Sequence, residues 1–89
     1  MLDVTAQVSI YPLRQEQLGP AIAEAVACLK QVGLDVWEGA MSTLVAGDLD
    51  TVCTSLQHAF ATAATHGEVV LVVTLSNACP VPAQRPDSA

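Results

Sequence analysis

The sequence predicts an α+β ferredoxin-like sandwich of order β-α-β-β-α-β, with two helices on one face of a four-stranded antiparallel sheet. Four short strand-like segments are interspersed with two segments of helical periodicity. A weak repeat places Gly33-Leu34-Asp35-Val36 and Gly67-Glu68-Val69-Val70 at two helix-to-strand junctions. Two β-α-β halves with right-handed crossovers produce this sandwich, and 89 residues suffice for one such domain.

The first half of the chain contains one strand and one helix. Residues 4–12 alternate between apolar and polar side chains, which is typical of a strand with one buried face, and Pro12 ends it. The helix begins at Gly19-Pro20, where proline loses no hydrogen bond, and Gly33 suits the position after its end. The apolar stripe that we expect to be buried is Leu18, Ile22, Val26 and Leu29.

The second half repeats the pattern after a hairpin. Residues 34–39 and 41–48 are the two hairpin strands, and Asp48 is a suitable N-cap for the helix that follows. Gly67 ends that helix, and EVVLVVTLS, residues 68–76, is the last strand. The apolar stripe of the second helix is Leu49, Val52, Leu56, Phe60 and Ala63. We expect residues 1–80 to form one ferredoxin-like domain and 81–89 a flexible tail.

The last strand is apolar on both faces. Val69, Leu71, Val73 and Leu75 alternate with Val70 and Val72, whereas a sheet with one hydrated face would alternate with polar residues. We therefore expect a homodimer or homotetramer joined through the sheets, which would cover the apolar surface. The alternative is a very hydrophobic central strand in a monomer.

Charge and cysteine content restrict the class of function. Three basic and nine acidic residues give a net charge of −6, which disfavours nucleic-acid binding. The start of the chain has no signal-peptide pattern, and EVVLVVTL is too short to span a bilayer as a helix. Three cysteines without a CxxC pair indicate neither a disulfide framework nor a zinc site. We expect a cytoplasmic protein without membrane insertion.

The reactive side chains have structural explanations. Cys28 and Cys53 flank apolar helix stripes, where cysteine acts as a small hydrophobe, and His66 suits the end of a helix. Cys79 is the one thiol near polar residues, but no histidine base lies beside it in the sequence. We therefore expect no metal and no cofactor. General acid/base catalysis by the acidic residues stays open, although Asp35, Asp48 and most of the others suit solvated surface positions or helix caps.

A set of polar side chains shares the sheet face opposite the helices. Gln7, Ser9 and Tyr11 lie on one strand face, Thr74 and Ser76 on the neighbouring strand, and Ser42 or Thr43 on the other side. Hydroxyls and an amide backed by valines would suit a flat heterocycle with ring nitrogens. The alternative is that these groups meet water, and the residues alone favour that alternative.

Three segments together resemble the YkoF-like family of thiamine- and hydroxymethylpyrimidine-binding proteins. They are AQVSIYPL near the start, MSTLVAGDLDTV in the middle and VVTLSNACP near the end, and they keep the family's order from Val4 to Pro80. The resemblance implies a ferredoxin-like fold and binding of the pyrimidine part of thiamine. Members with two tandem modules suggest that this single module acts as an oligomer.

The resemblance also implies site residues. The matching positions are Ser9, Tyr11, Pro12, Ser42, Thr43, Gly47, Asp50, Ser76, Cys79 and Pro80, while Cys53 stands where the family usually has an aromatic. Combined with the polar set, the expected ligand-binding residues are Gln7, Ser9, Tyr11, Ser42, Thr43, Ser76, Asn77 and Cys79. In this hypothesis Tyr11 contacts the face of the pyrimidine while hydroxyls bind its nitrogens and amine.

The expected function is non-catalytic binding of thiamine or its hydroxymethylpyrimidine moiety, as a carrier or sequestering protein. The alternative is a ligand-sensing or scaffold module that acts through its oligomeric state. A small hydrolase or isomerase using Cys79 is the least favoured hypothesis, because no base accompanies the thiol.

Overall fold

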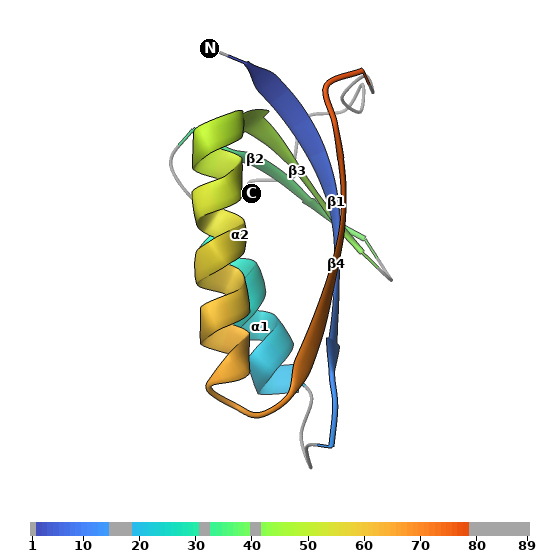
Figure 1. The fold of residues 1–89 in the computed structure, drawn as a ribbon, viewed down its shortest axis with the longest axis vertical. Helices are drawn as coiled ribbons and strands as arrows, with labels where there is room; N and C mark the ends of the chain where they lie inside the picture. Colours follow the sequence, from blue (N-terminus) through green and yellow to red (C-terminus); the bar gives the residue numbers. More distant parts are fainter. Residues whose placement is uncertain (1, 15–18, 31–32, 40–41, 79–89) are drawn as a thin grey trace.

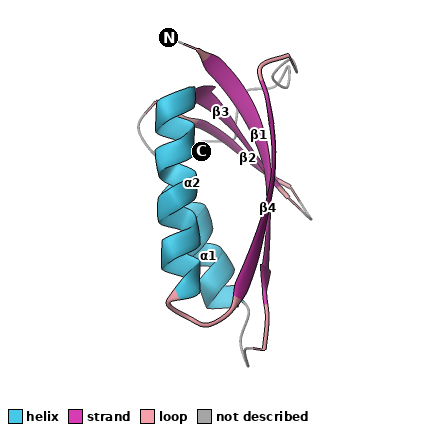
Figure 2. Ribbon diagram, in the orientation of Figure 1, coloured by secondary structure: helices cyan, strands magenta, loops and turns pink. Residues whose placement is uncertain are grey.

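The computed structural model confirms the predicted fold. It describes residues 2–14, 19–30, 33–39 and 42–78. The elements are β1 (Asp3–Pro12), α1 (Gly19–Leu29), β2 (Asp35–Glu38), β3 (Thr43–Asp48), α2 (Leu49–Ala64) and β4 (Val69–Ser76). Both helices cover one face of the sheet and leave the other face free of helices (Figures 1 and 2). The expected tail, 81–89, lies outside the described residues.

The sheet has strand order β2-β3-β1-β4, with every neighbouring pair antiparallel. The register places Val8 opposite Thr43 on one side and opposite Val73 on the other. Because side chains alternate along a strand, residues that are directly opposite share a face. The even-numbered residues of β1 therefore face the helices, and the odd-numbered residues form what we call the open face.

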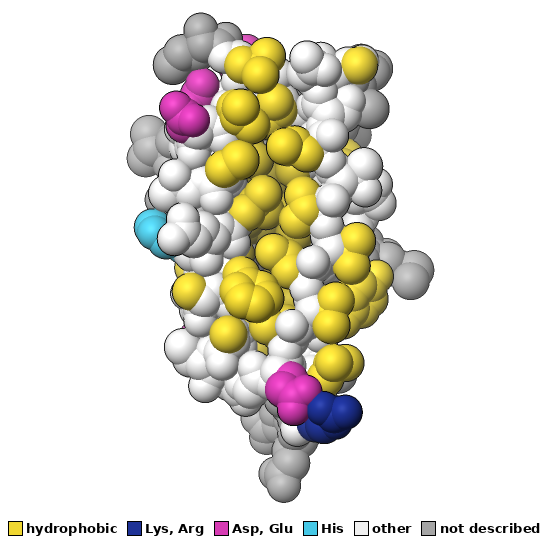
Figure 3. All heavy atoms as spheres, in the orientation of Figure 1, with side chains coloured by type: hydrophobic (Ala, Val, Ile, Leu, Met, Phe, Trp, Pro, Cys, Tyr) yellow, Lys and Arg dark blue, Asp and Glu magenta, His cyan; other side chains and the backbone are white. Residues whose placement is uncertain are grey.

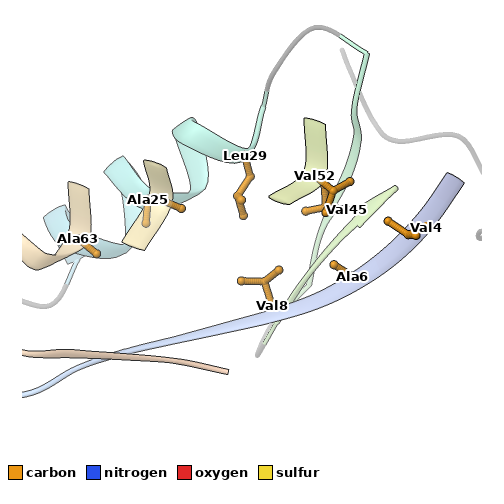
Figure 4. Packing of buried hydrophobic residues seen from close by; sticks show 9 residues of the cluster. Val4, Ala6, Val8, Ala25, Leu29, Val45, Val52 and Ala63 are labelled. Atoms are coloured by element: carbon orange, nitrogen blue, oxygen red, sulfur yellow. The ribbon is translucent and has the colours of Figure 1, made fainter. Parts of the chain in front are cut away.

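The core lies between the helices and the even-numbered positions of β1. Val4, Ala6 and Val8 point from β1 toward Leu29 of α1 and Val52 of α2 (Figure 4). All five are buried, and they belong to a cluster built largely of alanine and valine. Small side chains allow the helices to approach the sheet closely.

Local signals at the ends of α2 agree with the sequence prediction. The Asp48 side chain accepts a hydrogen bond from the Thr51 backbone N–H at 3.4 Å, as expected of an N-cap. After the helix, Gly67 has a φ of 140°, a conformation that favours glycine. The chain turns from α2 toward β4 at this glycine, where a residue with a Cβ atom would be strained.

The predicted apolar stripe of α1 is partly wrong. The buried residues of α1 are Ala21, Ala25, Val26 and Leu29, whereas Ile22 is half-buried and Leu18 lies outside the described residues. Two alanines thus face the core where larger residues were expected. The physical reason is the close contact between α1 and α2, which only small side chains permit.

The stripe predicted for α2 is also partly wrong, although Val52 and Ala63 are buried and Leu49 and Leu56 pack against the core. Its buried residues are Val52, Ser55, Ala59 and Ala63, while Phe60 is 45% exposed. Ser55 is tolerated in the core because its hydroxyl donates to the Val52 carbonyl at 2.8 Å. Phe60 therefore lies on a flank of the helix that the rest of the described chain leaves uncovered.

No helix within the described ranges is both long and apolar enough to span a bilayer.

Candidate functional site

The open face carries a regular grid of side chains set by the strand register. One row across the sheet consists of Asp35, Ala46, Thr5 and Ser76. The next row consists of Trp37, Leu44, Gln7 and Thr74. Directly opposite side chains in an antiparallel sheet have Cβ atoms about 5 Å apart, so each row can contact one small ligand.

A depression of about 480 Å³ lies at the end of the sheet that contains the first of these rows. The complete row of Asp35, Ala46, Thr5 and Ser76 lines it. Asp3, Val4, Gly33, Gly47, Asp48 and Asn77 complete the lining. The volume falls within the range of small-molecule sites in proteins. Since Ala46 has the smallest side chain of the row, it leaves the space between Asp35 and Thr5 open.

Three carboxylates make the depression electronegative. Asp3 lies opposite Asp48, and Asp35 approaches from β2. The two described cationic side chains are engaged with other acids: Arg14 pairs with Glu68, and Lys30 pairs with Glu38 at 2.6 Å. Neither Arg14 nor Lys30 lines the depression. The charge of this site therefore favours a cationic ligand over an anionic one.

Hydrogen-bonding groups from β1 and β4 face the same depression. Ser76 Oγ accepts from the Ala78 backbone N–H at 2.9 Å, which holds the turn after β4. Its own hydroxyl hydrogen is left to donate to a ligand acceptor, and the Thr5 hydroxyl lies on the opposite strand. The Asn77 amide can both donate and accept. Together these groups can hydrogen-bond a ring that carries nitrogens and an exocyclic amine.

The structure separates the residues predicted to bind ligand into distinct locations. Ser76 and Asn77 line the depression. Gln7 and Ser9 lie further along the open face, opposite Thr74 and Val72, and Tyr11 lies beyond them opposite Val70. Ser42 directly precedes Thr43, the residue of β3 that pairs with Val8, and its side chain is half-buried. Cys79 lies outside the described residues.

The placement of Thr43 on the ligand-binding face is wrong. It pairs with Val8, is 7% exposed and faces the helices. The sequence left open whether Ser42 or Thr43 faced the ligand, because that depends on the register of β3 against β1. A shift of one residue exchanges the two faces of a strand.

Sequence reasoning missed four lining residues with polar or charged side chains: Asp3, Thr5, Asp35 and Asp48. It interpreted Asp48 correctly as a helix cap and placed Asp35 among surface acids. The available signal was that Asp3, Asp35 and Asp48 all occupy strand ends. The strand order β2-β3-β1-β4 and the antiparallel pairing then bring these strand ends to the same end of the sheet.

The remaining reactive groups do not form a second site in the described part of the chain. Cys28 donates to Thr62 Oγ1 at 3.4 Å between the two helices, and Cys53 is an exposed free thiol. His66 pairs with Glu24 at 3.1 Å. No group of three or more histidine, cysteine or acidic side chains among the described residues is arranged to hold a metal ion.

A family model described as "Thiamine-binding protein" matches residues 6–77. The chain belongs to the thiamine-binding protein family. The match extends from β1 through β4 and includes Thr74, Ser76 and Asn77. It confirms the resemblance inferred from the three sequence segments.

Solved structures of similar proteins agree with the fold of this thiamine-binding family member. A hypothetical protein of Methanocaldococcus jannascii has a TM-score of 0.77 and 27% identity over 100% of this chain and 87% of its own. A Bacillus cereus domain of unknown function has a TM-score of 0.75 and 21% identity, covering 91% of this chain and 83% of its own. A Thermotoga maritima protein, described as a candidate thiamine biosynthesis/salvage protein, has a TM-score of 0.72 and 17% identity, covering 82% and 81%. No curated protein matches the chain significantly.

Proposed function

We propose that this protein binds thiamine or its hydroxymethylpyrimidine moiety without catalysing a reaction on it. The observation that carries the proposal is a depression of about 480 Å³ in a member of the thiamine-binding family, lined by three carboxylates and three hydrogen-bonding side chains. Thiamine combines a cationic thiazolium with an aminopyrimidine, and both parts have complementary groups here. A role as a carrier or sequestering protein follows from binding alone.

In this proposal the two rings use different parts of the site. The thiazolium lies among Asp3, Asp35 and Asp48, which supply the opposite charge. The aminopyrimidine lies toward Thr5, Ser76 and Asn77, which supply donors and acceptors for its nitrogens and amine. A ligand lacking these polar atoms would leave protein groups unpaired in the complex, which is the basis of selectivity.

The charge of the site also predicts which thiamine derivatives it accepts. A phosphate ester would place negative charge near three carboxylates, and neither Arg14 nor Lys30 lines the depression to compensate. Repulsion between the phosphate and the three carboxylates therefore disfavours phosphorylated ligands. Unphosphorylated thiamine should therefore bind more tightly than thiamine monophosphate or diphosphate.

Oligomerisation through the sheets remains part of the proposal. The open face exposes Tyr11, Val70 and Val72, which form an apolar group beside the polar rows. Apposition of a second sheet would remove this surface from water and enclose a bound ring. The assembled protein is expected to be a homodimer or homotetramer located in the cytoplasm.

Isothermal titration calorimetry on the full chain tests the proposal. We expect thiamine to bind with a dissociation constant on the order of 1 μM, which corresponds to about −8 kcal/mol. Hydroxymethylpyrimidine should bind more weakly, and thiamine diphosphate should bind least. Absence of heat above buffer with folded protein and millimolar thiamine would refute the proposal. A change in molecular mass on adding thiamine would favour the sensing or scaffold alternative.

A further inference from the structure

Two carboxylates in the depression face each other across a strand pair. Asp3 of β1 lies directly opposite Asp48 of β3, and both residues line the depression. Directly opposite side chains in an antiparallel pair have Cβ atoms about 5 Å apart, and like charges in this position destabilise a sheet. The presence of both carboxylates therefore needs an explanation other than the stability of the sheet.

No lysine or arginine in the described part of the chain offsets this repulsion. Arg14 follows the far end of β1 and pairs with Glu68, while Lys30 pairs with Glu38. On the face drawn in Figure 3, dark-blue basic atoms appear at the lower end of the molecule, whereas β1 begins at the upper end (Figure 1). The two opposed carboxylates are thus left without a described cationic neighbour in the depression.

Asp48 has a structural role that accounts for its charge. Its Oδ2 atom accepts hydrogen bonds from the Thr51 backbone N–H at 3.4 Å and from the Thr51 hydroxyl at 3.5 Å. It stands at the N-terminus of α2, where the positive end of the helix dipole stabilises a carboxylate. Asp48 is therefore explained by the helix that it caps.

Asp3 has no comparable structural role. Its side chain is exposed, and within the described residues its carboxylate takes part in no hydrogen bond or ion pair. The backbone nevertheless holds it near Asp48, because the Leu49 N–H at the start of α2 donates to the Leu2 carbonyl at 2.8 Å. A side chain that breaks a local rule without a compensating contact is expected at a functional site.

We propose that Asp3 is the residue that makes this site selective for a positively charged ligand, and that the bound cation relieves the repulsion between Asp3 and Asp48. The inference rests on the proposed function and gives its three carboxylates unequal roles. Asp48 keeps its place as the helix cap, and Asp35 lies on β2, on the other side of β3 from Asp3. Asp3 is then the carboxylate that contacts the cation.

A cation beside Asp3 gains from two effects. It is attracted to a carboxylate that has no other partner among the described residues, and it removes a repulsion that the ligand-free protein carries. A neutral ligand gains from neither effect. Asp3 therefore sets the preference of the site for thiamine over neutral hydroxymethylpyrimidine, and the same side chain lowers the stability of the ligand-free fold.

Urea unfolding of the ligand-free full chain tests the repulsion. We expect Asp3→Asn to unfold at a higher urea concentration than the parent, by about 0.2–0.5 M for a like-charge pair in a sheet. Asp50→Asn is the matched control, because Asp50 is an exposed acid in the first turn of α2 that does not line the depression. It changes the net charge by the same amount but loses a favourable interaction with the helix dipole, so it should bring no gain.

A double-mutant cycle shows whether the gain originates from Asp48. In an Asp48→Asn background the change Asp3→Asn should bring little or no increase in the urea midpoint, because the opposing charge is already gone. Circular dichroism verifies that each variant is folded. An Asp3→Asn variant that is no more stable than the parent, or that gains equally in both backgrounds, overturns the proposal.

Calorimetry on the same variants tests the selectivity. Asp3→Asn should weaken thiamine binding about three- to tenfold and leave the affinity for hydroxymethylpyrimidine within about twofold of the parent value. Asp50→Asn should bind both ligands as the parent does. A parent that does not bind thiamine refutes the proposed function together with this inference. A parent that binds thiamine, with an Asp3→Asn variant that binds it equally well or weakens for both ligands alike, overturns the role of Asp3 alone.

Discussion

Tyr11 and Ser76 lie at opposite ends of the β1–β4 ladder on the same face of the sheet. Ser76 is opposite Thr5, whereas Tyr11 is opposite Val70, six residues further along β1. At about 3.3 Å per residue this separates the two positions by about 20 Å. One planar ring cannot contact both, so a site in the depression at Ser76 excludes ring stacking on Tyr11 of the same chain.

Tyr11→Ala is therefore expected to leave thiamine affinity within about twofold of the parent value, a change of about 0.4 kcal/mol. Calorimetry at equal protein concentration measures this directly. Tyr11→Phe serves as the control, because it keeps the ring and removes the hydroxyl. A loss of tenfold or more with Tyr11→Ala but not with Tyr11→Phe would place the ligand at the Tyr11 end of the open face.

Ala46→Leu is expected to abolish thiamine binding. Ala46 lies between Asp35 and Thr5 in the row that lines the depression, and a leucine would occupy the space that the ligand requires. Ala46→Ser adds only a hydroxyl and should keep binding close to that of the parent. Circular dichroism of both variants verifies folding. Unchanged affinity for Ala46→Leu would place the ligand elsewhere.

Asp35→Asn is expected to weaken thiamine binding about two- to fivefold, since an exposed opposite charge contributes about 0.5–1 kcal/mol. Binding of neutral hydroxymethylpyrimidine should stay the same. Glu38→Gln is the matched control, because Glu38 lies on the same strand but pairs with Lys30. Raising the salt concentration should reduce the difference between Asp35→Asn and the parent. Equal weakening of both ligands would argue against an electrostatic role.

Asp48→Ala is expected to lower the free energy of unfolding by about 1 kcal/mol, because the Thr51 N–H loses its capping acceptor. Such a loss lowers the melting temperature of a domain of this size by about 4–8 °C. Asp48→Asn retains a side-chain oxygen and should unfold close to the parent in urea. An equal loss of stability in both variants would show that charge, rather than capping, is the stabilising factor.

Gly47→Ala is expected to destabilise the protein by about 1–3 kcal/mol through overpacking. A Cβ atom at this position would lie 2.5 Å from Leu34 Cδ2 and 3.0 Å from the Gly33 carbonyl oxygen. The carbonyl belongs to the backbone and cannot rotate away. Gly19→Ala is the control, because an added Cβ there meets nothing within 4 Å. Urea unfolding of the two variants should differ by most of the predicted amount.

The two helices show which features the sequence pattern predicts and which it does not. Asp48 as the N-cap of α2 and Gly67 after its end were predictable, because each depends on the backbone of a few neighbouring residues. The assignment of Phe60 to the core was wrong, although its spacing from Leu49 and Leu56 is helical. Periodicity identifies an apolar flank but does not say what covers it. In this chain the small residues Ser55, Ala59 and Ala63 are buried, and Phe60 is left 45% exposed.

The candidate site could be predicted only in part, because most of its residues are distant from one another in the sequence. Ser76 and Asn77 were predicted from the end of the last strand, and both line the depression. Asp3, Asp35 and Asp48 are far apart in sequence and become neighbours only through the strand order and register. Thr43 was misplaced for the same reason, since one residue of register decides the face.

The order of elements and the local caps were determined by the sequence alone, because alternation, helical spacing and turn residues act over a few positions. Tertiary structure alone decided which face each side chain occupies, which acids converge and which strands lie at the edges of the sheet. Those features depend on pairing between distant strands, for which a short-range pattern carries no information.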